Sequence, residues 1–265
     1  MELFKIIQPH YLLAPYVKHH WILETTKEMQ EGERVIPTGS VQLIFHKADR
    51  MFSSTKSDLQ PQSFICGQSI GYSDLKLTGT VRMIVTVFHP NGAKPFFKIP
   101  INQFCNFDIS VNDLEEISLK ELNAKVLDAE TNEESINHIE EYLISKLYLS
   151  DTFDHKRISA AIQLVNKNTA PNIHLLADAC CLSEKQFNRK FSEYVGINPK
   201  KFLRIVRFQR ALYKLHLNPR DNLAQLASEC GFYDQPHMTK EFNTFSGYSP
   251  IEYLQACAPY SDYFS

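Results

Sequence analysis

The spacing of apolar residues changes along the chain and divides it into a β-rich and a helical part. Before about residue 110, the apolar residues form short runs of β-branched and aromatic side chains, as in 41–46 (VQLIFH) and 81–89 (VRMIVTVFH). Residues 63–66 and 74–80 are two further runs, and turn-forming residues such as Pro90-Asn91-Gly92 separate them. Short strands divided by turns are typical of a barrel or a double-sheet jelly roll. We therefore predict a β-rich domain over about 1–110.

From residue 112 the composition becomes acidic and the apolar spacing becomes helical. Thr131 and Glu134 have the spacing of a capping box, which predicts a helix over 131–148. Its apolar residues recur at intervals of three and four, which places them on one face: Ile136, Ile139, Leu143 and Leu147. That face has to be buried, either against its own β domain or against the same helix of a second subunit. Residues 151–154 are predicted to form a short polar linker after this helix.

One pattern occurs twice in the last hundred residues. Residues 188–203 (NRKFSEYVGINPKKFL) return as 239–254 (TKEFNTFSGYSPIEYL) at a single offset. The matching pairs are Phe191 and Phe242, Gly196 and Gly247, Pro199 and Pro250, and Leu203 and Leu254. A repeat at a fixed period indicates that one structural unit is used twice.

Each copy begins with the residues of a helix-turn-helix. In the first copy, a short apolar-faced helix around Leu175–Cys180 precedes a turn, and Ser183 can cap a second helix over 184–194. In the second copy, a helix around Leu223–Ala227 precedes a turn at Gly231, and Asp234 can cap the next helix. Between the copies, residues 201–217 have apolar positions at helical spacing and contain no proline or glycine. A single helix there could hold the two units at a fixed separation.

This arrangement resembles the AraC/XylS family of bacterial transcription regulators. In the first copy the resemblance lies in LA at 176–177, S-x-x-x-F-x-R-x-F at 183–191, G-x-x-P at 196–199 and R-x-x-x-A at 207–211. In the second copy it lies in LA at 226–227, GF at 231–232 and K-x-F-x-x-x-x-G-x-S-P-x-x-Y at 240–253. The family usually has arginine where Lys240 stands, and commonly a small polar residue where Pro236 stands.

The resemblance implies an α+β protein of two domains. Residues 1–150 would form a cupin-like jelly roll with C-terminal helices, and residues 151–265 an all-α DNA-binding domain with two helix-turn-helix units. The implied function is a transcription regulator that binds promoter DNA in two successive major-groove segments, with RNA polymerase as a further partner. A small-molecule effector and a homodimer through helix 131–148 are the remaining partners that we consider.

The resemblance also places DNA contacts on the outer faces of the two second helices. On an isolated helix, a merely solvated polar face would be the simpler interpretation. Arginine and lysine suit O6 and N7 of guanine, whereas asparagine and glutamine suit N6 and N7 of adenine. The predicted base contacts are Lys185, Asn188, Arg189, Gln235, His237, Thr239 and Lys240. The predicted phosphate contacts are Ser183, Lys200, Lys201 and Arg204.

The formal net charge of −2 is unevenly distributed along the 265 residues. Residues 152–265 contain 14 Lys and Arg against 10 Asp and Glu, a net charge of +4, whereas residues 1–151 contain 14 against 20, a net charge of −6. Positive charge therefore gathers in the part that is expected to meet phosphates. No apolar run approaches the length of a membrane span, and the first ten residues lack the order of a secretory signal. We expect a cytoplasmic protein.

The competing hypothesis is a cupin-like enzyme domain fused to a DNA-binding module. It would need a metal triad or a reactive cysteine within residues 1–150. His46 and His89 end β-like runs, but no H-x-H or H-x-x-x-H spacing pairs them with a nearby carboxylate. We therefore predict no enzyme activity, no metal and no cofactor. The adjacent Cys180 and Cys181 allow a redox switch, although small apolar residues are commonly buried at such a turn.

Overall fold

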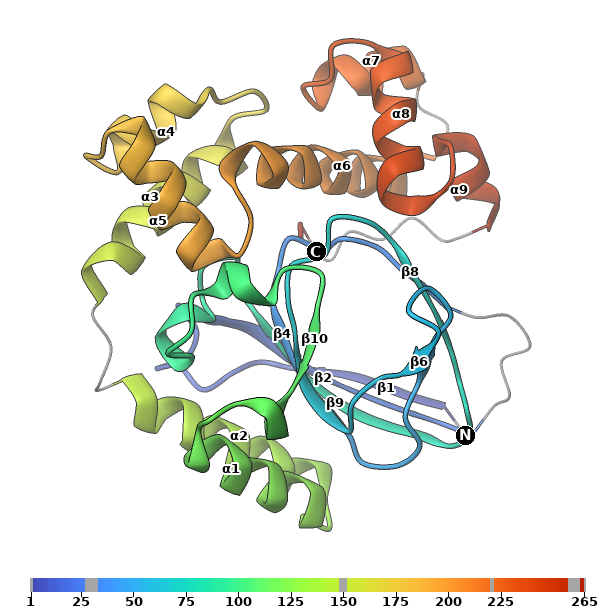
Figure 1. The fold of residues 1–265 in the computed structure, drawn as a ribbon. Coiled ribbons are helices and arrows are strands. Elements are labelled where there is room, and N and C mark those ends of the chain that lie inside the picture. The colour runs from blue at the N-terminus through green and yellow to red at the C-terminus, as the bar shows by residue number, and fades with distance from the viewer. Residues whose placement is uncertain (1, 27–32, 148–151, 220–221, 257–262, 265) are drawn as a thin grey trace.

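The structure is a computed structural model that describes residues 2–26, 33–147, 152–219, 222–256 and 263–264. Two β-sheets, backed by two helices, form the N-terminal region, and a group of helices forms the C-terminal region (Figure 1). The predicted division at 150/151 lies outside the described residues and stays a prediction.

The N-terminal region is a sandwich of two antiparallel sheets. The larger sheet has the order β1 (Glu2–Ile7), β2 (Val17–Thr25), β9 (Val81–Phe88), β4 (Gln42–His46), β7 (Ser63–Cys66) and β10 (Asp108–Ser110). The smaller sheet has the order β3 (Glu33–Val35), β8 (Ser73–Lys76), β5 (Phe52–Ser53) and β6 (Asp58–Leu59). The β-rich sandwich expected from the sequence is confirmed, and four of its strands coincide with the predicted runs.

The central strand β9 shows why one run of the sequence is almost continuously apolar. Met83 and Val85 face the smaller sheet, whereas Ile84 and Phe88 face the helices that cover the other side. Side chains alternate between the two faces of a strand, so a strand that is buried on both faces is apolar at most of its positions. Alternation of polar and apolar residues is therefore absent where burial is deepest.

Helices α1 (Ile117–Asp128) and α2 (Asn132–Leu147) cover the outer face of the larger sheet (Figure 1). Ile136, Ile139 and Leu143 of α2 are buried in the same apolar cluster as Phe45 and Phe88 of the sheet. The apolar stripe of this helix therefore packs within its own chain, and a homodimer through the helix stays a prediction. Short 3₁₀ helices connect the layers: η1 (Lys94–Phe96), η2 (Ile101–Phe104) and η3 (Val111–Asp113).

The C-terminal region consists of short helices arranged around one long helix. In chain order they are α3 (Thr152–Lys167), α4 (Ile173–Ala179), α5 (Glu184–Val195), α6 (Pro199–Leu217), α7 (Leu223–Glu229), α8 (Gln235–Ser246) and α9 (Pro250–Ala256). The predicted linker over 151–154 is wrong in part, because 152–154 form the first turn of α3 and residue 151 lies outside the described residues. Asp154 shows the reason: its carboxylate pairs with Arg157 one turn later and with Lys190 of α5, which makes a polar sequence part of a packed helix.

The first helix of the C-terminal region packs directly on the N-terminal region. The side-chain amide of Asn91 donates hydrogen bonds to the backbone oxygen of His155 (3.1 Å) and to Ser159 Oγ (2.8 Å), both on α3. The ring of His155 lies 4.6 Å from that of Tyr16, centroid to centroid, and is buried. Burial, with a smaller effect from His89, lowers the pKa of His155 to about 4.

Acid should therefore weaken the fold. Burial also lowers the pKa of His46, inside the sandwich, to about 4. Both histidines are neutral when folded but take up a proton near pH 6.5 when unfolded, so their stabilisation is complete above about pH 6.5 and is lost as the pH falls toward 4. We expect each histidine to lower the free energy of unfolding by about 2 kcal/mol when the pH has fallen to about 4.5. Urea unfolding across this range measures the loss. His155→Gln should reduce the pH dependence, and His174→Gln, which changes an exposed histidine, is the control. An unchanged slope in His155→Gln would contradict the assignment.

Candidate nucleic-acid interface

Both halves of the repeat form the expected helix-turn-helix, with matching caps. Asn172 caps α4 by accepting from the backbone N–H of Leu175 (2.7 Å), and Asn222 caps α7 in the same way. Ser183 and Gln186 form a complete capping box at the start of α5, and Asp234 accepts from the N–H of His237 at the start of α8. These caps satisfy the amides that a helix leaves unpaired at its start, which explains why polar residues occur at these positions in both copies.

The turn between the paired helices uses the same backbone conformation twice. Cys181 in the first unit and Gly231 in the second both have positive φ, of 52° and 82°. Each follows a buried cysteine, Cys180 or Cys230, and precedes an apolar residue, Leu182 or Phe232, that packs in the core. Cys181 is exposed and Cys180 is buried, so the expectation of a buried pair holds only for Cys180.

Aromatic packing determines which face of each second helix is exposed. In the first unit, Phe191 is fully buried, and its ring centroid lies 5.3 Å from those of Phe187 and Phe202. In the second unit, the repeat-equivalent Phe242 is fully buried 5.0 Å from Phe208. Both units are therefore packed on α6, at its two ends, and stand on the same side of the sandwich (Figure 1).

On α5, the predicted base-contact residues lie on the surface. Lys185 and Arg189 are exposed, and within the described residues neither side chain forms a hydrogen bond or an ion pair. Asn188 is half-buried, and its amide donates to the backbone oxygen of Glu184 (2.7 Å). The cationic groups of Lys185 and Arg189 therefore have no partner among the described residues, whereas the amide of Asn188 is already hydrogen-bonded.

On α8, Gln235 and Lys240 are exposed, and Thr239 is half-buried. These three side chains, with Pro236, Asn243 and Thr244, line a shallow hollow on the outer face of the helix. His237 is less accessible than expected, because its Nδ1 accepts from the backbone N–H of Tyr233 (3.2 Å) and its Nε2 lies 3.8 Å from Glu241. His237 therefore braces the turn in addition to lining the surface.

The structure adds residues to this surface that we did not predict. Tyr233 is 91% exposed beside the N-terminus of α8, and Asn243 and Thr244 extend the exposed face by one turn. The second copy has one residue more than the first ahead of the cap of its second helix, and this residue is Tyr233. The insertion is the sequence feature that could have indicated its exposed position.

The predicted phosphate contacts do not share one environment. Ser183, Lys200 and Lys201 are exposed at the N-terminal ends of α5 and α6. Arg204 instead donates from Nε to both carboxylate oxygens of Glu241, at 3.1 and 2.9 Å. Glu241 is buried, so the pair ties α6 to α8, and only Nε of the partly exposed Arg204 is engaged. A phosphate would therefore have to bind its terminal nitrogens.

Comparison with known proteins agrees with this geometry. A helix-turn-helix domain family matches residues 176–256, and a family described as a domain of unknown function (DUF6597) matches residues 5–110. The C-terminal region is an AraC-type helix-turn-helix domain. Its recognition helices, by their order in the two units, are α5 and α8.

The AraC-type domain also accounts for the similarity to curated relatives. An uncharacterized HTH-type transcriptional regulator of Haemophilus influenzae is 29% identical over 103 residues, which cover 38% of this chain and 34% of the relative. The HTH-type transcriptional activator RhaS of Escherichia fergusonii is 30% identical over 80 residues, covering 30% of this chain and 28% of the relative. The chain thus spans about a third or less of the length of these relatives. The crystal structure of ToxT from Vibrio cholerae O395 matches 89% of this chain and 96% of its own, at 10% identity and a TM-score of 0.45.

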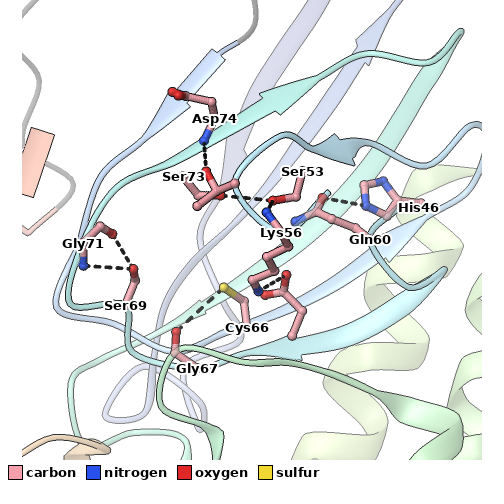
Figure 2. A network of polar contacts seen from close by, with 12 residues as sticks. His46, Ser53, Lys56, Gln60, Cys66, Gly67, Ser69, Gly71, Ser73 and Asp74 are labelled. Carbon is pink, nitrogen blue, oxygen red and sulfur yellow. Dashed lines mark hydrogen bonds and ion pairs between the residues drawn. The ribbon is translucent and has the colours of Figure 1, made fainter. Parts of the chain in front are cut away.

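A second group of polar side chains lies in the sandwich, and at Asp74 it adjoins Arg34, which contacts the end of α8. Figure 2 shows side chains from β4, β5, β7 and β8 and their connecting segments pointing toward one another. Ser53 Oγ and Ser73 Oγ are 3.3 Å apart, Lys56 Nζ pairs with Asp108 (2.7 Å), and His46 Nε2 meets Gln60 Oε1 (3.3 Å). The other ring nitrogen of His46 is buried without a hydrogen-bond partner. The His46 side chain has no exposed surface, so this nitrogen is a polar group that the described residues leave unsatisfied.

No helix in the described part of the chain is long and apolar enough to cross a membrane.

Proposed function

We propose that this chain is a transcription regulator that binds double-stranded promoter DNA through α5 and α8. One observation carries the proposal: the same recognition unit occurs twice on one helix, and each unit presents exposed polar side chains that the fold does not use. A helix-turn-helix inserts this face into the major groove, where amide and cationic side chains can bind base edges.

The dimensions of α6 support two contacts on one face of a duplex. Its 19 residues span about 28 Å at the usual helical rise. Successive major-groove segments on the same side of DNA lie one helical turn apart, about 34 Å. Because the two units pack at the ends of α6 and project sideways from it, their spacing suits two neighbouring segments.

Within this proposal, the cationic side chains that have no partner in the described part of the protein have the main role in recognising the bases. Lys185 and Arg189 would bind guanine edges, and Gln235 with Lys240 would read the second segment. Asn188, His237 and Thr239 would contribute from less exposed positions. Ser183, Lys200 and Lys201 would bind phosphates and set the register, with Arg204 joining them through its terminal nitrogens.

Two further roles belong to the proposal. The N-terminal domain would sense a small polar effector, which the unpartnered ring nitrogen of His46 and the neighbouring polar network support. Such an effector would act by binding one arrangement of the two domains more tightly than another. RNA polymerase as a partner and a cytoplasmic location accompany the proposed promoter target, and a homodimer through helix 131–148 stays a prediction.

The test is selection of sequences by the full-length chain from a randomised duplex pool at low and high salt. The proposal expects a two-part motif with half-sites about one helical turn apart, which persists at high salt. Binding that is weak, strongly salt-dependent and without sequence preference would reject it.

Arg189→Ala should reduce specific affinity by about 1–3 kcal/mol, the scale of one bidentate base contact, and should relax the preference at one position of the first half-site. A binding titration against the selected duplex and its single-base variants measures both effects. Lys125→Ala is the matched control, because it removes the same charge from an exposed position on α1, remote from the recognition helices. Unchanged affinity and unchanged base preference in Arg189→Ala would contradict the assignment.

A further inference from the structure

The same point of each repeat touches the N-terminal domain. Gly196 ends α5 and Gly247 ends α8, and these equivalent glycines have positive φ, of 96° and 74°. A β-carbon at position 196 would lie 3.1 Å from Gln68 Cγ and from Ile101 Cγ2. A β-carbon at position 247 would lie 2.7 Å from Arg34 Nη1 and 2.9 Å from ring atoms of Tyr72. Both recognition helices therefore end against the sandwich.

The second of these contacts is built around Arg34 of β3. Its Nε and Nη2 donate to the two carboxylate oxygens of Asp74 on β8, at 2.7 and 3.0 Å. Its Nη1 donates to the backbone oxygen of Ser246, the last residue of α8, at 3.0 Å. The guanidinium carbon lies 4.2 Å from the ring centroid of Tyr72 and 4.5 Å from that of Tyr248. Arg34 thus bonds its own sheet on one edge and α8 on the other, between two aromatic rings.

The chemistry of this contact suits a fixed joint. A carboxylate bound through two parallel N–H groups holds the guanidinium plane in one orientation. The carbonyl groups at the C-terminal end of a helix carry partial negative charge, so a cation there is favourable. Both stacked tyrosines add cation–π attraction and limit access of water.

The chain that follows Arg34 continues along the C-terminal domain. Ile36 is buried in the apolar cluster of that domain. The backbone oxygen of Pro37 accepts a buried hydrogen bond from Gln209 Nε2 of α6, at 2.7 Å. Residues 34–37 therefore contact both the long helix and the end of the second recognition helix.

We propose that Arg34 is a positioning residue for the second recognition helix, so that the N-terminal domain, together with α6, sets the separation of the two recognition helices. Arg34 acts through the end of α8 and contacts no DNA itself. A displacement of β3 or β8 would be transmitted to α8 through this joint, which gives the N-terminal domain a physical route to the DNA-binding surface. The consequence for DNA rests on the proposed function, whereas the positioning role does not.

The positioning role can be measured without DNA. Spin-labelled residues introduced at the exposed positions 185 and 243 of the full-length chain report the distance between α5 and α8. We expect one narrow distance distribution in the parent, a broader one in Arg34→Ala, and an intermediate one in Arg34→Lys, which keeps the charge and loses the bidentate pair. Arg82→Ala is the control, because Arg82 pairs with Glu24 on the larger sheet. An Arg34→Ala distribution identical to that of the parent would overturn the proposal.

The consequence for DNA is measured with unlabelled protein and duplexes in which the two half-sites are moved apart by one to four base pairs. The parent and Arg82→Ala should lose affinity steeply as the spacing departs from its best value. Arg34→Ala should bind the best spacing on the order of tenfold more weakly and should lose less at other spacings. A spacing profile in Arg34→Ala that matches the parent would reject the proposal. If the parent selects no sequence at all, the proposed function fails, and the distance measurement still decides the role of Arg34.

Discussion

Phe242→Ala is expected to lower the free energy of unfolding by about 3–5 kcal/mol, because it removes a fully buried aromatic ring and leaves a cavity. The ring packs edge-on against Phe208 of α6, and Tyr253 of α9 lies 6.3 Å away on another side. It is therefore one of the contacts that join the second helix-turn-helix to the long helix, together with Phe245 and the Arg204–Glu241 pair. Domains are commonly stable by only 5–15 kcal/mol, so a loss of this size should also impair DNA binding.

Urea unfolding of the full-length chain measures the change. The control is Asn243→Ala, the adjacent residue on α8, whose exposed side chain should change stability by less than about 0.5 kcal/mol. A loss below about 1 kcal/mol in Phe242→Ala would show that the second unit is held mainly by other contacts.

Gly231→Ala should destabilise the second unit by about 3 kcal/mol, through two separate causes. The backbone at Gly231 has φ of 82°, a conformation that costs a residue with a side chain about 1–2 kcal/mol. A β-carbon there would also lie 2.4 Å from the backbone oxygen of Thr169, in the segment between α3 and α4. That oxygen is main chain, so it can move only if the segment moves with it.

The first repeat supplies the control for this prediction. Cys181 occupies the equivalent turn position with φ of 52° and already carries a β-carbon, so Cys181→Ala should change the unfolding midpoint little. Cys181→Ala adds neither cost, so the difference between the two variants measures the combined cost of the backbone conformation at Gly231 and of the close approach to Thr169. Equal tolerance of alanine at both positions would contradict both causes. The first unit should still recognise its half-site in Gly231→Ala, which footprinting on the selected duplex would show.

The repeated helix-turn-helix was predictable because the residues that determine it act locally. Ser183 and Asp234 cap helices through the amides of their own first turns, and Phe191 and Phe242 recur at the same place in each unit. A polar cap followed by apolar residues at intervals of four predicts a helix and its buried face without reference to the rest of the chain. The exposed positions of Lys185, Arg189 and Lys240 follow directly.

The state of individual polar residues was not predictable in this way. Arg204 has the spacing of a phosphate contact, but its guanidinium is bound by Glu241, which lies 37 residues later. His237 points outward by periodicity, yet it bonds the backbone of Tyr233. Helical periodicity gives the direction of a side chain and says nothing about which distant group occupies its hydrogen bonds.

The strands β1 and β2 and the helix α3 escaped prediction for a related reason. β2 carries two histidines and a lysine among its apolar residues, and its strand conformation is stabilised by pairing with β1 and β9 on both sides. α3 begins with a polar turn whose Asp154 is paired with Lys190 of α5. Neighbours supplied by tertiary structure outweighed weak local preference.

The sequence alone determined the repeated helix-turn-helix, its caps and its exposed faces, because caps, periodicity and repeats act over a few residues. Only the tertiary structure decided that Arg34 joins β3 to the end of α8, that the two glycines ending the recognition helices rest on the sandwich, and that α2 packs on its own sheet. Each of these depends on residues far apart in the chain meeting at one distance and orientation, and no local pattern encodes such a meeting.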